Sequence, residues 1–147
     1  MGKVQHSGLH FRHRIPWNEK AGLTMKQPLA FVIDDDVDLG KAFSQALEFS
    51  GFSTLQIIDS TQAMPLIILQ QPDLVMLDMQ MPRMNGREVL EAIRAHEATR
   101  HTKVIVATAN SYITDETLNN MADLVLQKPV SLSQIMQFAR RILTMRE

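Results

Sequence analysis

The chain contains no cysteine, which excludes disulfide bonds and metal sites built from thiolates. It also lacks any apolar run long enough to cross a membrane or to form the hydrophobic part of a signal peptide. Neither sign of charge is in large excess, because 15 lysine and arginine residues stand against 16 aspartate and glutamate residues. We therefore expect a soluble, cytoplasmic protein that does not contact a membrane.

The charges are unevenly distributed along the 147 residues. Residues 1–26 are basic, which leaves the remainder acidic and argues against nucleic acid as a direct partner. The same residues show no periodicity of 2 or 3.6, so we interpret them as a poorly ordered extension and residues 27–147 as one domain. His6, His10 and His13 lack the acidic or cysteine company of a metal site, and a solvated tail is the interpretation that we prefer.

From Leu29 onward, short apolar runs alternate with amphipathic stretches. This alternation predicts an α/β fold in which a parallel sheet is covered by helices on both faces. The runs that we assign to strands are Leu29–Ile33, Ser53–Ile57, Leu74–Leu77, Val104–Ala107 and Leu124–Leu126.

Five helices are expected to accompany these strands. The first follows Asp38 and ends near Gly51, a residue suited to a helix C-terminus. The second begins at Asp59 or Ser60 and contains Pro65, which should kink it or delay its regular part. The remaining helices are expected at Arg87–His96, at Asp115–Asn120 and after Ser131, with capping boxes formed by Asn85 with Glu88 and by Ser131 with Gln134.

The stretch PDLVMLDMQMPRMNG, residues 72–86, centres on Asp78. Its four apolar residues 74–77 predict a strand buried on both faces, so Asp78 stands at the carboxyl end of that strand. A carboxylate fixed at the end of a strand is well placed to act as a nucleophile or a metal ligand. Taken alone, however, an aspartate at a strand end more often forms a turn.

In a doubly wound parallel sheet, all strands present their carboxyl ends at one edge, where ligands bind. Several carboxylates a few ångströms apart repel one another without a counter-ion, and Mg²⁺ is an oxygen-preferring cation that meets this need. A cation, an ammonium and a hydroxyl around a carboxylate also suit phosphoryl transfer. The polar groups expected at this edge are Asp34, Asp35 and Asp36 after the first strand, Asp78 after the third, Thr108 after the fourth and Lys128 after the fifth.

Each of these groups also has an ordinary structural interpretation. The three consecutive aspartates can form a solvated turn, and Asp36 or Asp38 can cap a helix. Thr108 can be a strand-end hydroxyl, and Lys128 with Pro129 can form a surface turn. The coincidence of complementary groups at the ends of four strands favours a functional site.

Four motifs, in their order and spacing, resemble the receiver domain of two-component response regulators: FVIDDD, PDLVMLDMQMPRMNG, VIVATAN and LVLQKPV. The resemblance covers about residues 27–147. It implies a flavodoxin-like, doubly wound sheet of five parallel strands in the order 2-1-3-4-5, with five helices.

The resemblance also implies roles for individual residues. Asp78 would be the phosphoacceptor, and Asp34 and Asp35 would bind Mg²⁺ together with Asp78. The backbone carbonyl of Gln80 would supply a further metal ligand. Thr108 and Lys128 would contact the phosphoryl group, and the Lys128–Pro129 peptide bond would be cis.

By the same resemblance, the phosphoryl donor is a histidine kinase or a histidine phosphotransfer protein. Chemistry would be limited to self-phosphorylation and hydrolysis, so the chain is not expected to be an enzyme. Because only Met145, Arg146 and Glu147 follow the last helix, we expect a stand-alone receiver, monomeric or weakly dimeric, that signals by binding a downstream protein.

Two alternatives stay open at this stage. A haloacid-dehalogenase-like phosphatase also uses a strand-end aspartate with Mg²⁺, although its DxDx[TV] motif would need Thr or Val at Asp38. The chain could also be a fragment of a larger DNA-binding regulator or hybrid kinase. Translation could begin at Met1 or at Met25.

Two positions depart from the pattern of the resembling family. Val125 stands where many receivers have a Tyr or Phe that turns inward on activation, and Met121 replaces a usual Gly. Because Val125 is short and stiff at χ1, we expect the loop after Thr108 to carry the switch instead, with Tyr112 changing its exposure.

Overall fold

The computed structural model describes residues 27–109 and 116–146. In this part of the chain, strands and helices alternate as the sequence predicts. The elements are β1 (Leu29–Ile33), α1 (Val37–Phe49), β2 (Ser53–Ile57), the 3₁₀ turn η3 (Ser60–Gln62), α2 (Ala63–Gln70), β3 (Leu74–Asp78), α3 (Gly86–Ala95), β4 (Lys103–Thr108), α4 (Glu116–Met121), β5 (Leu124–Gln127) and α5 (Leu132–Met145).

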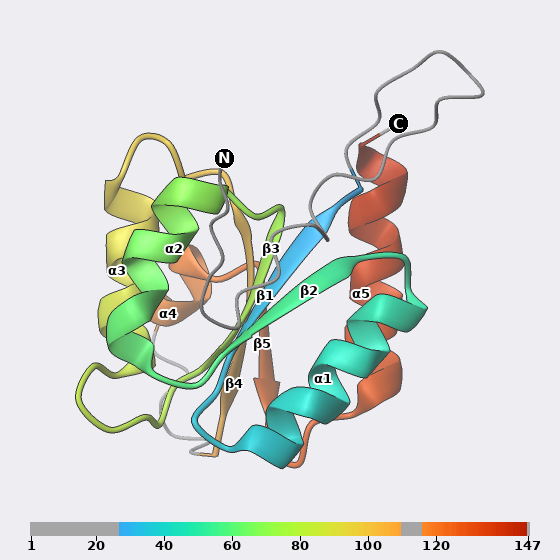
Figure 1. The fold of residues 1–147 in the computed structure, drawn as a ribbon, viewed down its shortest axis with the longest axis horizontal. Coiled ribbons are helices and arrows are strands. Elements are labelled where there is room, and N and C mark those ends of the chain that lie inside the picture. The colour runs from blue at the N-terminus through green and yellow to red at the C-terminus, as the bar shows by residue number, and fades with distance from the viewer. Residues whose placement is uncertain (1–26, 110–115, 147) are drawn as a thin grey trace, which may run out of the picture.

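The five strands form one parallel sheet in the order β2-β1-β3-β4-β5, which confirms the predicted topology (Figure 1). The chain first moves outward from β1 to β2 and then crosses back to β3, so the order reverses between β1 and β3. In open sheets of this kind, ligands bind at the carboxyl ends of the strands near the point of reversal. The register pairs Asp78 of β3 with Ala107 of β4, and Thr108 with Gln127 of β5.

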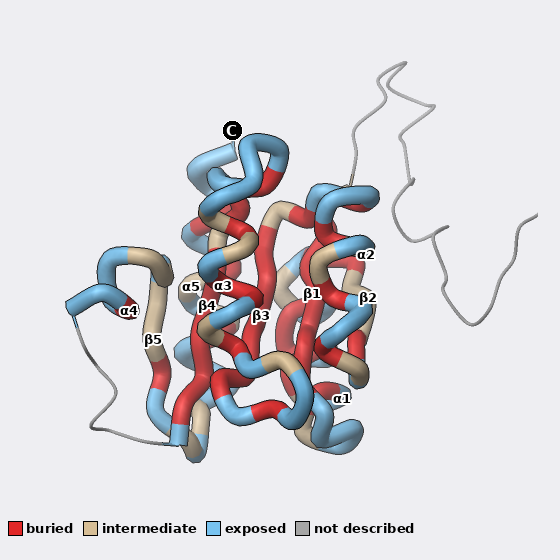
Figure 2. Tube along the Cα trace, turned by 90° about the vertical axis from the view of Figure 1, so that its left-hand side faces the viewer, coloured by how far each residue is buried: buried red, intermediate tan, exposed pale blue. Residues whose placement is uncertain are grey.

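Helices cover both faces of the sheet, with α1 and α5 on one face and α2, α3 and α4 on the other (Figure 1). Because successive side chains of a strand point to opposite faces, β1 supplies both layers of the core. Phe31 and Ile33 pack with α2 and α3, whereas Ala30 and Val32 pack with α1 and α5. The three inner strands are therefore buried along their length (Figure 2).

Three of the strands are longer than the sequence predicts. β3, β4 and β5 each extend through a polar residue at the carboxyl end, namely Asp78, Thr108 and Gln127. Apolar patterning cannot detect a polar residue that continues the backbone ladder. The two residues predicted at strand ends, Asp78 and Thr108, are thus held by the sheet itself.

The first helix corrects one expectation. α1 begins at Val37 rather than after Asp38, and its N-cap is Asp36, whose Oδ1 accepts a hydrogen bond of 3.0 Å from the Leu39 N–H. Asp38 lies in the first turn, where its charge favours the helix N-terminus. Gly51, just beyond the end of the helix, has a φ of 115°, a conformation that glycine adopts without steric cost.

Pro65 delays the second helix, as expected. Asp59 caps the 3₁₀ turn η3, and α2 proper starts at Ala63. Pro65 consequently lies in the first turn of α2, where its missing N–H removes no intrahelical bond.

The other caps follow the sequence signals. Asn85 and Glu88 form the predicted capping box at the start of α3. Of the predicted capping box at α5, the structure shows one half, in which Ser131 accepts a hydrogen bond from the Gln134 N–H. α4 begins at Glu116, and Asp115, where this helix was expected to start, lies outside the described residues. Tyr112, on which the switching expectation rests, also lies outside them.

The carboxylate of Asp73 joins the two ends of the described fold. Its Oδ2 accepts a hydrogen bond of 2.8 Å from the Leu29 N–H at the start of β1. The same oxygen lies 3.3 Å from Nη1 of Arg146, which follows α5.

Among residues 27–109 and 116–146, no helix has both the length and the apolar character needed to cross a bilayer.

Candidate functional site

Asp78 is the last residue of β3 and is only 3% exposed. The chain turns away directly after it, while the Met79 N–H still donates to the Ala107 carbonyl of β4 at 3.0 Å. The start of α3 lies against this turn, because the Gly86 N–H donates to the Met79 carbonyl at 3.3 Å. The backbone around Asp78 is therefore fixed on both sides.

Two further carboxylates lie beside Asp78. Asp34 and Asp35 follow β1, and oxygen atoms of the three side chains all lie within 4.8 Å of one another. Asp34 is buried at 2% exposure, whereas Asp35 is exposed to solvent. Asp36 is not part of this cluster, since its side chain caps α1.

Lys128 and the backbone of Gln80 complete the surroundings of Asp78. The Lys128 ammonium lies 2.9 Å from Oδ1 of Asp78, and the Gln80 N–H donates to the same oxygen at 3.1 Å. Lys128 directly follows β5, and the peptide bond to Pro129 is cis, as the resemblance implies. The Lys128 backbone N–H also donates to the Thr108 carbonyl at 2.8 Å, so the ends of β4 and β5 are tied together.

Thr108 ends β4 and is 1% exposed. It is linked to the Asp78 side of the site through the carboxamide of Gln80, which donates from Nε2 to the Thr108 Oγ1 at 3.3 Å. The same carboxamide accepts a hydrogen bond of 3.0 Å from the Ala109 N–H. The sequence does not predict these side-chain contacts of Gln80, because they depend on the approach of two loops 28 residues apart.

The electrostatics of the cluster indicate an incomplete charge balance. The pKa of Asp34 is raised to about 6, chiefly by burial, and the nearby carboxylates of Asp78 and Asp35 act in the same direction. The Asp36 N–H and the Lys128 ammonium act in the opposite direction on the same pKa. One oxygen of Asp34, Oδ2, is buried without a hydrogen-bond partner.

These residues fit a divalent cation. Three carboxylates converge, one of them retains a buried oxygen without a donor, and carboxylate oxygens are ligands that Mg²⁺ prefers. A single ammonium, that of Lys128, cannot balance three carboxylates. The arrangement is typical of the metal site of a receiver domain.

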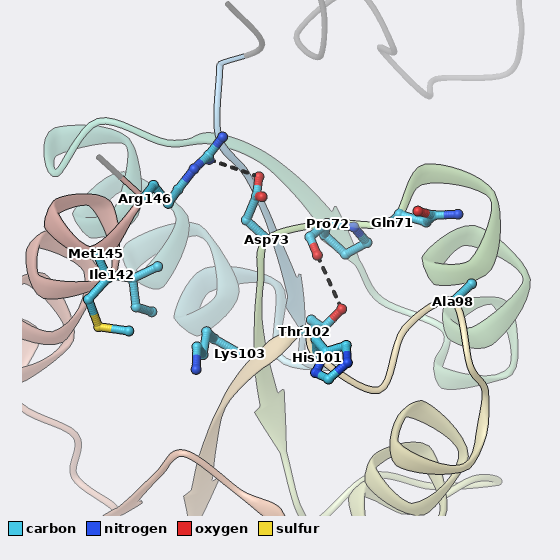
Figure 3. Close-up of a pocket in the computed structure, with 10 residues that line it drawn as sticks. All are labelled: Gln71, Pro72, Asp73, Ala98, His101, Thr102, Lys103, Ile142, Met145 and Arg146. Atoms are coloured by element: carbon cyan, nitrogen blue, oxygen red, sulfur yellow. Dashed lines mark hydrogen bonds and ion pairs between the residues drawn. The ribbon is translucent and has the colours of Figure 1, made fainter.

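Two cavities lie on different edges of the molecule. One of about 440 Å³ adjoins the acidic cluster at Asp35, and its lining includes Arg83 and Asp59, which form an ion pair of 3.0 Å. The other, of about 340 Å³, lies between the start of β4 and the end of α5 (Figure 3). Because Asp78 ends the parallel strand β3, this cavity is at the opposite edge of the sheet. Its walls include the Arg146–Asp73 pair and a 3.3 Å hydrogen bond from the Thr102 Oγ1 to the Pro72 carbonyl, so this second cavity is separate from the acidic site.

Known proteins resemble the chain in both sequence and structure. The DNA-binding dual master transcriptional regulator RpaA of Synechocystis is 31% identical over 118 residues, which cover 79% of this chain and 49% of the relative. The DNA-binding response regulator MtrA of Mycobacterium bovis is 33% identical over 119 residues, covering 80% and 50% of the two chains. The chain thus spans about half the length of these curated relatives. The receiver domain of the Francisella response regulator 1452 superposes with a TM-score of 0.72 at 24% identity, over 82% of this chain and 99% of that one.

The sequence profile of the family described as "Response regulator receiver domain" matches residues 30–140. This range contains every residue of the acidic site, from Asp34 to Lys128. Members of the family are phosphoacceptor modules of two-component and phosphorelay signalling rather than enzymes in the usual sense. With most of its length matched, and with five parallel strands in the family's order, this chain belongs to the response regulator receiver domain family.

Proposed function

We propose that Asp78 accepts a phosphoryl group from a histidine kinase or a histidine phosphotransfer protein, in a reaction that requires Mg²⁺. The observation that carries this proposal is the convergence of three carboxylates and one ammonium on the end of β3. Asp78 is the member of the cluster that contacts Lys128, and it stands at the centre of the strand ends. The family match supports a receiver over the phosphatase alternative.

In the proposed reaction, a carboxylate oxygen of Asp78 attacks the phosphorus of a phosphohistidine. The new P–O bond forms as the P–N bond breaks, and the histidine imidazole of the donor leaves. Lys128 compensates negative charge on the phosphoryl oxygens, and the Thr108 hydroxyl donates a hydrogen bond to one of them. Positioning and charge neutralisation are the main requirements of phosphoryl transfer, and these side chains supply both.

The metal ligands in this proposal are the carboxylates of Asp34, Asp35 and Asp78 with the backbone carbonyl of Gln80. When bound, Mg²⁺ would neutralise charge on the phosphoryl oxygens. The mutual repulsion of the carboxylates and the unpartnered Oδ2 of Asp34 support this assignment.

Intact-mass measurement with acetyl phosphate as the donor tests the proposal. The wild-type chain should gain one phosphoryl mass with Mg²⁺ and none with EDTA, and Asp78→Asn should gain none. Circular dichroism of the variant provides the folding control. Labelling that persists in a folded Asp78→Asn protein would refute the assignment of the acceptor.

We further propose that the phosphorylated receiver works in the cytoplasm as a stand-alone module, monomeric or weakly dimeric, and signals by binding a downstream protein. The acidic balance outside residues 1–26 supports a protein partner over direct contact with nucleic acid. Both curated relatives are named as DNA-binding regulators, and each is about twice as long as the matched region. Immunoblotting of the native protein decides the matter, because a mass well above 16.7 kDa would contradict the stand-alone proposal.

A further inference from the structure

Gln80 joins the two loops that flank the proposed phosphorylation site. It lies two residues after Asp78, and its backbone N–H donates to the Asp78 carboxylate at 3.1 Å. Its side chain reaches across to the end of β4, where it contacts Thr108 at 3.3 Å and the Ala109 N–H at 3.0 Å. The side chain thus contacts the segment that leaves the sheet beside Asp78.

Hydrogen-bond chemistry fixes the orientation of this carboxamide. The Ala109 N–H can only donate, so it must face the Oε1 of Gln80. The Nε2 group must then face Thr108, whose Oγ1 accepts the second bond. One side chain therefore binds a backbone donor and a hydroxyl oxygen at adjacent residues.

A phosphoryl group on Asp78 would compete with Gln80 for one of these partners, the Ala109 N–H. Its oxygens are acceptors, as Oε1 of Gln80 is, and the β3–β4 register brings Asp78 level with Ala107, two residues before Ala109. The Ala109 N–H can be the donor to the carboxamide or to a phosphoryl oxygen, but it has only one proton to give. The Thr108 hydroxyl is not contested in this way, because it accepts from Nε2 of Gln80 through its oxygen and would donate to a phosphoryl oxygen through its proton.

We propose that the Gln80 carboxamide is a latch that holds the exit of β4, Thr108 and Ala109, in its resting arrangement. Oε1 of Gln80 and a phosphoryl oxygen on Asp78 are alternative acceptors for the Ala109 N–H, so phosphorylation releases the latch at Ala109. This proposal rests on the proposed function of Asp78. It assigns Gln80 a positioning role through its side chain, apart from any metal contact of its backbone carbonyl.

The latch has a measurable consequence for the resting equilibrium. A protein held in its resting state binds an activating ligand more weakly than one that is not held. Removing the hydrogen bond between the Ala109 N–H and Oε1 of Gln80, which exists only in the resting state, should therefore strengthen binding of a phosphoryl analogue by roughly two- to tenfold.

Gln80→Met tests the proposal, because it keeps the length of the side chain and the backbone carbonyl but removes the hydrogen bonds. Gln137→Met is the matched control, since Gln137 is an exposed residue of α5 and undergoes the same chemical change. Beryllofluoride with Mg²⁺ serves as the phosphoryl analogue, and its dissociation constant is followed by NMR titration. The hydrogen exchange rate of the Ala109 amide is measured before the analogue is added.

In Gln80→Met, we expect faster exchange at Ala109 in the resting protein and tighter binding of beryllofluoride. Both quantities should be unchanged in Gln137→Met. Unchanged or weaker binding in Gln80→Met would overturn the latch. So would a change confined to the hydrolysis rate of the acyl phosphate, because that result would assign Gln80 to water positioning.

Failure of the proposed function would give a different result. If Asp78 were not the acceptor, the wild-type protein itself would show no Mg²⁺-dependent binding of beryllofluoride. If only the latch were wrong, the wild type would bind the analogue and Gln80→Met would bind it equally well or less well.

Discussion

Three consecutive aspartates after β1 have different surroundings, although the sequence presents them as a run. Asp34 is buried, Asp35 is exposed within the acidic cluster, and Asp36 caps α1. Only the first two contribute oxygens to the cluster around Asp78. We therefore expect Asp35→Asn to weaken Mg²⁺ binding by about tenfold, or about 1.4 kcal/mol, since it removes one charged ligand.

Asp36→Asn is the matched control, because asparagine caps helices as well as aspartate does. Its dissociation constant for Mg²⁺ should equal that of the wild type in isothermal titration. Equal losses in the two variants would mean that the acidic pair is placed one residue too early.

Gly86 is required by its close contact with the β3 exit. A Cβ at this position would collide with the Asp78 carbonyl oxygen and would lie 2.7 Å from the Cα of Met79. Backbone atoms cannot move aside cheaply, so the collision outweighs the better helix propensity of alanine. We expect Gly86→Ala to lower the free energy of unfolding by about 1–3 kcal/mol in urea denaturation.

Gly40 provides the comparison. Its added Cβ would meet the Nε2 of Gln56 at 2.6 Å, which is the far end of a flexible side chain. Gln56 can turn away at the cost of one exposed hydrogen bond to the Val37 carbonyl, so Gly40→Ala should stay within about 1 kcal/mol of the wild type. If Gly40→Ala lowered the free energy of unfolding as much as Gly86→Ala does, a collision with backbone atoms would not be the cause of the loss at Gly86.

At the scale of single residues, the sequence predicts the members of the site but not all of their contacts. The site residues lie at or just after the carboxyl ends of strands, and a parallel sheet brings strand ends together by its topology alone: they are Asp34, Asp35, Asp78, Thr108 and Lys128. The carboxamide of Gln80 lies in a loop, where the direction of a side chain depends on neighbours distant in sequence. The roles of these residues in phosphoryl transfer stay predictions.

At the scale of elements, Arg94 of α3 links the segments that precede β4 and β5, at the amino ends of these strands. Its guanidinium donates to the carbonyls of Met121 at 2.8 Å, Arg100 at 3.0 Å and Thr102 at 2.7 Å. It also pairs with Asp123 at 3.0 Å, and that carboxylate accepts the N–H of Val104 at 2.8 Å. One side chain thus links α3, the start of β4 and the end of α4.

Arg94→Met should destabilise the fold, because methionine fills similar space but removes the guanidinium donor from three carbonyls and from the Asp123 carboxylate. We expect a loss of about 2–3 kcal/mol in unfolding free energy, with faster amide exchange at Val104. Arg140→Met, on the exposed face of α5, should change the free energy by less than about 0.5 kcal/mol. Similar losses in both variants would indicate that a general charge effect, and not the carbonyl contacts, is responsible.

Element boundaries show where sequence patterns lose information. The buried cores of β1, β3 and β4 are apolar runs that the sequence pattern locates correctly, but the strand ends that carry Asp78 or Thr108 look like loops. The start of α1 was placed wrongly because Asp36 and Asp38 are both suitable caps, and only the backbone path selects Asp36. The late start of α2 is predicted correctly from Pro65, because the missing N–H and the ring of a proline affect only the helical turn next to it.

At the scale of the whole molecule, residues 27–147 should suffice for the chemistry. The described fold begins with β1 at Leu29, and the family profile begins at residue 30. A chain that starts at Met25 should therefore fold and accept a phosphoryl group at a rate within about twofold of the full chain, which is below 1 kcal/mol. Intact-mass time courses check this rate, and an insoluble or inert shortened protein would show that residues 1–24 belong to the domain.

The Asp73 carboxylate has a consequence for protein engineering. Because it binds both the Leu29 N–H and Arg146, the first strand and the last helix of the fold start and finish side by side. A short peptide linker can bridge these points, and new termini can be opened between the exposed residues Glu97 and Ala98 to give a circular permutant with unchanged strand neighbours. For the same reason the domain can be inserted as a cassette into a surface loop of a host protein, with the edge that carries Asp78 facing away from the graft.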